Sequence, residues 1–161
     1  MTSTTARADS RNLRIFSLRY AAACFGRLGC VRALVAGGAD VNLADNCGVT
    51  PLWWAANNGQ LAAAEALVAA GADVDRGSRR GADVDTPEDT RPKWVDVDRA
   101  GGDGETPLYR ASFHGYERVV ALLLRARADK ALASDAGLRP ADVVCAGGNK
   151  QNANAIAALL R

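Results

Sequence analysis

The chain has 161 residues, of which 48% are hydrophobic, 24% charged and 6% aromatic. That is enough chain for one domain with a buried core, and too much for a peptide hormone. The 20 Lys and Arg residues against 18 Asp and Glu residues give a net charge of only +2. This balance argues against a disordered chain and against broad binding to nucleic acid or to an anionic membrane. The hydrophobic share is rich in alanine and leucine, which favours packed helices over an all-β fold.

Residues 1–12 are rich in Ser, Thr and Arg. We interpret them as a disordered leader, with an organelle transit peptide as the alternative. No apolar run in the sequence approaches the length of a transmembrane helix, so we expect no membrane association. Four scattered cysteines and a single histidine predict neither a zinc site nor a disulfide framework. We expect reduced thiols and therefore an intracellular protein, cytoplasmic or nuclear.

From residue 13 onward the sequence repeats itself with a period of 33 residues. Gly-Ala-Asp-Val-Asn at residues 38–42 returns as Gly-Ala-Asp-Val-Asp at residues 71–75. Thr-Pro-Leu-Trp at residues 50–53 returns as Thr-Pro-Leu-Tyr at residues 106–109, which is one period plus 23 residues. We therefore predict four units and one insertion between the second and third. The units cover about 13–44, 45–77, 101–133 and 134–161, and the inserted loop covers about 76–100.

The recurring residues predict two helices in each unit. Thr50 and Thr106 suit the N-cap of a first helix, because each is followed by a proline at the first helical position. Gly59 and Gly115 follow about two turns later, where a left-handed residue can end that helix and reverse the chain into a second one. We expect the first helix of the last unit to begin near Pro140.

The loops that follow the second helices are also predicted by the repeats. Asp73 and Asp75 recur at fixed positions of the unit, which marks them as loop-forming residues rather than as a catalytic acid and base. Arg127 stands where the other units have Gly38 and Gly71. A non-glycine residue is therefore expected at positive φ there.

A period of 33 residues headed by Thr-Pro-Leu resembles the ankyrin repeat family, over roughly residues 13–161. The resemblance implies an all-α solenoid of helix-turn-helix units with hairpin-like loops, in which the first and last units act as caps. The fourth residue of the tetrapeptide is usually histidine in that family. Here it is Tyr20, Trp53, Tyr109 or Asp142, so we expect aromatic packing in place of the hydrogen bonds that the histidine makes.

The inserted segment carries two further copies of the Asp-Val-Asp ending, which indicates a local duplication. Pro87, Pro92 and many charged residues argue against a long helix or a central strand within it. We therefore expect an extended loop. It is either a tolerated surface insertion or a flap that binds a partner through Trp94.

A search for chemistry finds no convergent set of catalytic groups, so we predict no enzyme activity, no metal and no cofactor. His114 directly precedes Gly115, and we interpret it as a capping or surface residue. Trp54 is a better candidate for a functional residue. Trp53 fills the position expected to pack inward, and the next residue of a helix points about 100° away.

The resemblance implies a partner-binding surface built from the loop tips and the exposed positions of the first helices. We predict binding of another protein there by a monomer, without nucleic acid or membrane. Alternatives are a regulatory inhibitor that occludes a partner enzyme such as a kinase, a scaffold or adaptor and, least favoured, a small-molecule binder or enzyme. The predicted contact residues are Trp54, Arg110, Phe113, Asn46, Val49, Asn57, Asp103, Glu105 and Trp94.

Overall fold

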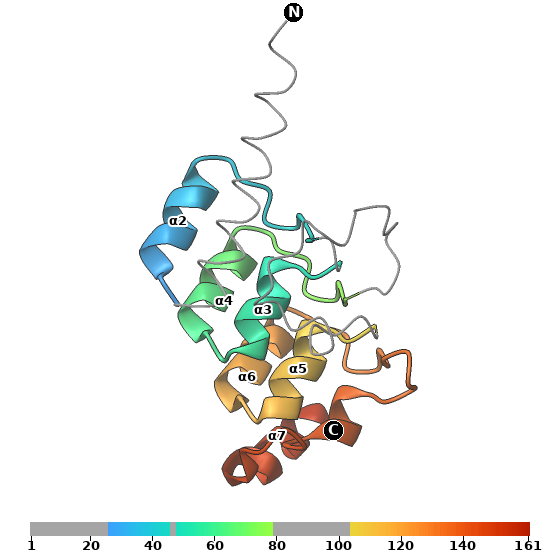
Figure 1. Cartoon of the computed structure of the whole chain (residues 1–161). Helices are drawn as coiled ribbons and strands as arrows, with labels where there is room; N and C mark the ends of the chain where they lie inside the picture. Colours follow the sequence, from blue (N-terminus) through green and yellow to red (C-terminus); the bar gives the residue numbers. More distant parts are fainter. Residues whose placement is uncertain (1–25, 46–47, 79–103) are drawn as a thin grey trace, which may run out of the picture.

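The computed structural model describes residues 26–45, 48–78 and 104–161 (Figure 1). Within these ranges the secondary structure is helical and contains no strand, which confirms the all-α class. The predicted leader, the first helix of the first unit and nearly all of the predicted insertion lie outside the described residues. The α-helices are α2 (Leu28–Ala36), α3 (Pro51–Asn57), α4 (Leu61–Ala69), α5 (Pro107–His114), α6 (Glu117–Arg125) and α7 (Ala153–Leu160), with the 3₁₀ helices η2 (Pro140–Val143) and η3 (Lys150–Asn152).

The helices stack in two rows. The first helices α3 and α5 lie side by side, and the second helices α2, α4 and α6 form the row next to them. The loops project from the side of α3 and α5 that faces away from the second helices (Figure 1). The core runs along the stack between the two rows. Its largest fully buried aliphatic side chains are Leu52, Leu67, Leu108, Leu123 and Ile156. Because these residues come from the second and third units and from the last helix, no unit buries its apolar face alone.

The predicted ends of the first helices are confirmed. The side chain of Thr50 accepts a hydrogen bond from the backbone N–H of Trp53 at 3.2 Å, and that of Thr106 from Tyr109 at 3.1 Å. The glycines after the two helices are left-handed, with φ of 68° at Gly59 and 79° at Gly115. These caps satisfy backbone N–H groups that a helix leaves unpaired at its start and allow the sharp reversal at its end.

The end of α6 also follows the sequence prediction. Arg127 has φ of 66°, and the glycines at the same position of the other units, Gly38 and Gly71, have φ of 76° and 87°. The stack thus keeps the backbone path of the unit even where the residue type disfavours it. The arginine carries a backbone strain that the two glycines avoid.

The fourth unit departs from the others. Its first helix starts at Pro140 as predicted, but it is a 3₁₀ helix that ends at Val143. Beyond it the backbone bonds to α5 instead of continuing the helix. The N–H of Cys145 donates to the Ser112 carbonyl at 2.8 Å, and Cys145 takes a positive φ of 58°. The last unit therefore adapts its backbone to cover the end of the third.

Three hairpin loops each contain the same two turn hydrogen bonds. In each hairpin, the first residue of the turn donates its N–H to a carbonyl of the opposite side. The carbonyl of that first residue accepts the N–H of the glycine that ends the turn. The distances are 3.0 and 2.8 Å for Asp45 with Val49 and Gly48, 2.9 and 2.8 Å for Ser134 with Leu138 and Gly137, and 3.0 and 2.9 Å for Ser78 with Glu105 and Gly104. The third hairpin closes like the others although residues 79–103 intervene. We therefore place the insertion between Ser78 and Gly104, at residues 79–103, three residues later than the predicted 76–100.

The acidic residues of the loops tie neighbouring units together. Asp73 donates its backbone N–H to Asn42 Oδ1 at 2.7 Å, and Asp129 donates in the same way to Asp75 Oδ1 at 2.8 Å. The Asp73 carboxylate also accepts the N–H of Asp75 at 3.1 Å, which forms the loop itself. Asp73 and Asp75 are thus loop-forming residues, as their recurrence predicts.

Candidate partner-binding site

The two adjacent tryptophans of α3 have different surroundings. Trp53 is fully buried, and its indole N–H donates to the Glu105 carbonyl of the next unit at 2.8 Å. Trp54 is half-buried, packs edge-on against Trp53 with ring centroids 5.3 Å apart, and has its indole nitrogen 3.5 Å from Asp45 Oδ2. The indole of Trp53 therefore supplies an inter-unit hydrogen bond, which the expectation of aromatic packing alone does not include.

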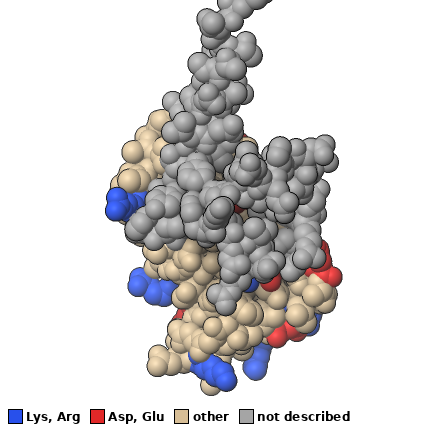
Figure 2. Space-filling view, viewed as in Figure 1, with Lys and Arg blue, Asp and Glu red and all other residues tan. Residues whose placement is uncertain are grey.

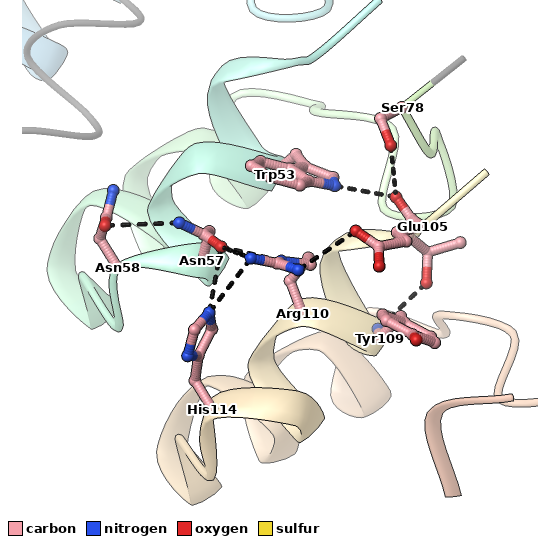
Figure 3. Close-up of polar contacts among 9 residues, drawn as sticks. Trp53, Asn57, Asn58, Ser78, Glu105, Tyr109, Arg110 and His114 are labelled. Carbon is pink, nitrogen blue, oxygen red and sulfur yellow. Dashed lines mark hydrogen bonds and ion pairs between the residues drawn. The ribbon is translucent and has the colours of Figure 1, made fainter. Parts of the chain in front are cut away.

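Arg110 of α5 lies at the centre of a network that joins the second and third units (Figure 3). Its Nε and Nη2 atoms donate to Asn57 Oδ1 at 2.8 and 2.6 Å, and its Nη1 pairs with Glu105 Oε2 at 3.2 Å. The guanidinium also lies 5.1 Å from the centroid of the Trp53 ring and 5.2 Å from that of Phe113. Only 14% of the Arg110 side chain is exposed, so we assign it chiefly to holding the two units together.

His114 is part of the same network rather than a simple helix cap. Its Nε2 lies 3.2 Å from Asn57 Oδ1 and 3.3 Å from Arg110 Nη2 (Figure 3). Its ring stacks on Tyr116 with centroids 5.7 Å apart. Burial, and then the positive charge of Arg110, lowers the pKa of His114 below its ordinary value. The neutral imidazole is therefore the form that this environment favours.

Phe113 ends this face at the border with the last unit. Its side chain is half-buried, and a side chain at Gly147 would meet its ring at 2.5 Å. The N–H of Gly147 donates to the Phe113 carbonyl at 2.8 Å. The bare backbone of the last unit thus packs directly against Phe113, which leaves only part of the ring accessible.

Val49 does not have the exposure that the sequence prediction requires, because its side chain is only 1% exposed. The hairpin turns it towards the core directly before the N-cap Thr50. Glu105 stands at the same position of the next unit, but its carboxylate reaches Arg110 instead. The predicted contacts Asn46, Asp103 and Trp94 lie outside the described residues, and Asn57 is half-buried with Arg110 bound to its Oδ1.

Sequence reasoning missed the role of His114 and the internal bonding of the charged residues. The repeat does indicate that these residues lie on one face, because Arg110 and Trp54 occupy the same position of successive units, as do His114 and Asn58. These positions line one face of the first helices. In the described ranges, no group of three or more His, Cys, Asp or Glu side chains is arranged to hold a metal.

The two rows of helices and the recurring hairpins define a helical repeat protein. The family model for three copies of the ankyrin repeat matches residues 18–134, and the chain belongs to the ankyrin repeat family. The last unit from residue 134 onward lies beyond that match. Ankyrin repeats are generally non-catalytic modules for protein–protein interaction. A search of curated proteins gives no significant match. None of the helices in the described ranges has both the length and the apolar character needed to cross a membrane.

Proposed function

We propose that this chain binds a partner protein through the face of α3 and α5 that carries Trp54, Asn57 and Phe113. The observation that supports this most is the Arg110 network, which fixes polar and aromatic side chains of two units in one arrangement. A surface that is already ordered loses little conformational entropy when a partner docks. Tryptophan and phenylalanine provide large contact areas with few rotatable bonds.

The residues of this face have different roles in the proposal. Trp54 and Phe113 are half-buried and offer apolar area to a partner. Arg110 and Glu105 neutralise each other and are 14% and 13% exposed, so they position the face more than they contact the partner. Asn46, Asp103 and Trp94 remain predicted contacts at the hairpin tips. We propose a monomer that acts inside the cell without a cofactor.

Site-specific crosslinking tests this assignment. A photoreactive phenylalanine analogue replaces Trp54 or Phe113 in separate chains, and the matched control carries it at Ala158 on the exposed side of α7. We expect one discrete protein to crosslink from the first two positions, identified by mass spectrometry, and not from Ala158. Equal crosslinking from all three positions, or none from Trp54 and Phe113, would contradict the proposal.

The partner found in this way then tests the regulatory hypothesis. If the chain occludes an enzyme such as a kinase, adding the purified chain should inhibit that enzyme with the concentration dependence of binding. Trp54→Ala should weaken binding and inhibition together. Binding without inhibition, with a second protein held at the same time, would instead favour an adaptor.

A further inference from the structure

The third unit carries four exposed basic residues on and after its second helix. Arg118 and Arg125 belong to α6, and Arg127 and Lys130 follow its end. We call this group the third-unit basic surface. Within the part of the chain that the structure describes, none of these four side chains has a hydrogen-bond or ion-pair partner.

These four positions are basic only in the third unit. In the first and second units the same positions hold small or aliphatic residues without charge. The pairs are Gly29 and Ala62, Ala36 and Ala69, Gly38 and Gly71, and Val41 and Val74. The ankyrin fold itself therefore has no need for a positive charge at any of them.

The two basic residues of α6 share one face of that helix. Arg118 and Arg125 are seven residues apart, which places them on the same face of α6 about 10 Å apart along its axis. Arg127 and Lys130 are exposed and follow in the chain, two and five residues after the last residue of α6. Figure 2 shows Lys and Arg projecting on the side of the second helices and at the end formed by the last unit, while most visible Asp and Glu lie on the opposite side, where the loops are.

Helix stability does not account for the whole group. A cation in the last turn, such as Arg125, favours a helix, but Arg118 lies in the first turn, where the helix dipole disfavours positive charge. Arg127 occupies a left-handed backbone position that the other units give to glycine. Two of the four residues thus stand where they oppose local stability, which is typical of residues kept for binding.

The surroundings leave the positive charge in excess. Glu117 is half-buried in the first turn of α6, and Asp129 uses one carboxylate oxygen to accept the N–H of Ala131 at 2.8 Å. The exposed side of the neighbouring α4 holds Ala62 and Ala69, with one acid, Glu65. An approaching chain therefore meets a small group of cations beside a helix face that carries a single acid.

We infer that the third-unit basic surface binds an acidic segment of a partner protein. A span of about 10 Å matches about three residues of extended peptide, and Arg127 and Lys130 lengthen it by a few more. Neither α4 nor α6 contains an aromatic residue, so stacking with the bases of single-stranded RNA has no platform there. The surface also lacks the tryptophan or phenylalanine that inserts into a lipid interface. It is distinct from the face of Trp54 and Phe113.

The test uses the full chain and a fluorescein-labelled octaglutamate peptide as the probe. In the quadruple variant, each basic residue is replaced by the residue of the second unit: Arg118→Ala, Arg125→Ala, Arg127→Gly and Lys130→Val. These replacements suit the fold, because the second unit already carries them. The matched control, Arg32→Ala with Lys150→Ala, removes exposed cations from other units.

We expect the wild-type chain to bind octaglutamate in low salt and the quadruple variant to bind at least about fivefold more weakly, since each of four exposed ion pairs contributes a factor of about 1.5 to 5. The control variant and Trp54→Ala should bind the probe like the wild type, which separates this proposal from the one for α3 and α5. Absence of binding by the wild type, or equal loss in the control, would overturn the inference. Tighter binding of octauridylate or of phosphatidylserine vesicles than of octaglutamate would overturn the assignment to an acidic protein segment.

Discussion

Removing the insertion should stabilise the protein. Ser78 and Gly104 form the same turn hydrogen bonds as Asp45 and Gly48, yet 25 residues separate the first pair and two separate the second. Deletion of residues 79–101 leaves Gly102 and Asp103 between Ser78 and Gly104. The shortened hairpin then has the length of the others and restores an uninterrupted period of 33 residues.

The size of the effect follows from loop closure. Shortening the loop from 25 residues to two amounts to between three and four halvings of its length, and each halving saves about 0.6 kcal/mol, so the gain is about 2 kcal/mol. For a chain of this size, that gain raises the melting temperature by roughly 6–8 °C.

Urea denaturation followed by far-ultraviolet circular dichroism measures the change directly. The control deletes residues 79–102, which leaves only one residue before Gly104 and prevents the bond from Gly104 to Ser78 that closes the turn. We expect the 79–101 deletion to be the most stable of the three chains. The full chain and the control should both unfold at lower urea concentrations. A 79–101 deletion that is less stable than the full chain would refute the argument and show that the insertion packs as structure.

Three further predictions concern single residues. Leu123→Ala should lower the free energy of unfolding by about 3 kcal/mol in urea titrations, because Leu123 is fully buried, whereas Leu159→Ala, at 41% exposure, should change it by less than about 0.5 kcal/mol. Arg127→Gly should raise the free energy of unfolding by up to about 1 kcal/mol by relieving the positive φ, and an unchanged or lower value would contradict the strain. The pKa of His114 is lowered from 6.5 in the folded state, so the contribution of the neutral imidazole to stability is complete above pH 6.5 and falls as the pH drops below 6.5. The loss of stability at low pH should be smaller in His114→Asn. An identical pH dependence of unfolding in the two chains would refute this role of His114.

The ends of the helices were predictable because they depend on a few adjacent residues. A threonine followed by proline defines an N-cap, and the structure shows the cap bond at both Thr50 and Thr106. The positive φ of Arg127 was predictable for a related reason, since alignment of the units places it with two glycines. The short 3₁₀ helix of the last unit was not, because its length depends on backbone bonds from Cys145 and Gly147 to α5.

The candidate site was predictable only in part. The angle between successive helical residues correctly separates the buried Trp53 from the more accessible Trp54. The same reasoning fails at Val49, because a hairpin has no helical periodicity and its twist decides which side chain enters the core. Val49 is buried there, while Glu105 at the equivalent position pairs with Arg110.

Arg110 shows why contact between units limits what one sequence can predict. Its side-chain partners, Asn57 and Glu105, come from two different units, and their distances depend on how α3 stacks on α5. This internal bonding changes how a mutation at Arg110 must be interpreted. Arg110→Ala would remove the guanidinium from Asn57 Oδ1 and from the Glu105 carboxylate, so lost binding would partly report a loosened stack. Measuring the free energy of unfolding beside partner binding for Arg110→Ala and Trp54→Ala separates the two contributions, since a residue that only contacts the partner weakens binding and leaves the free energy of unfolding unchanged.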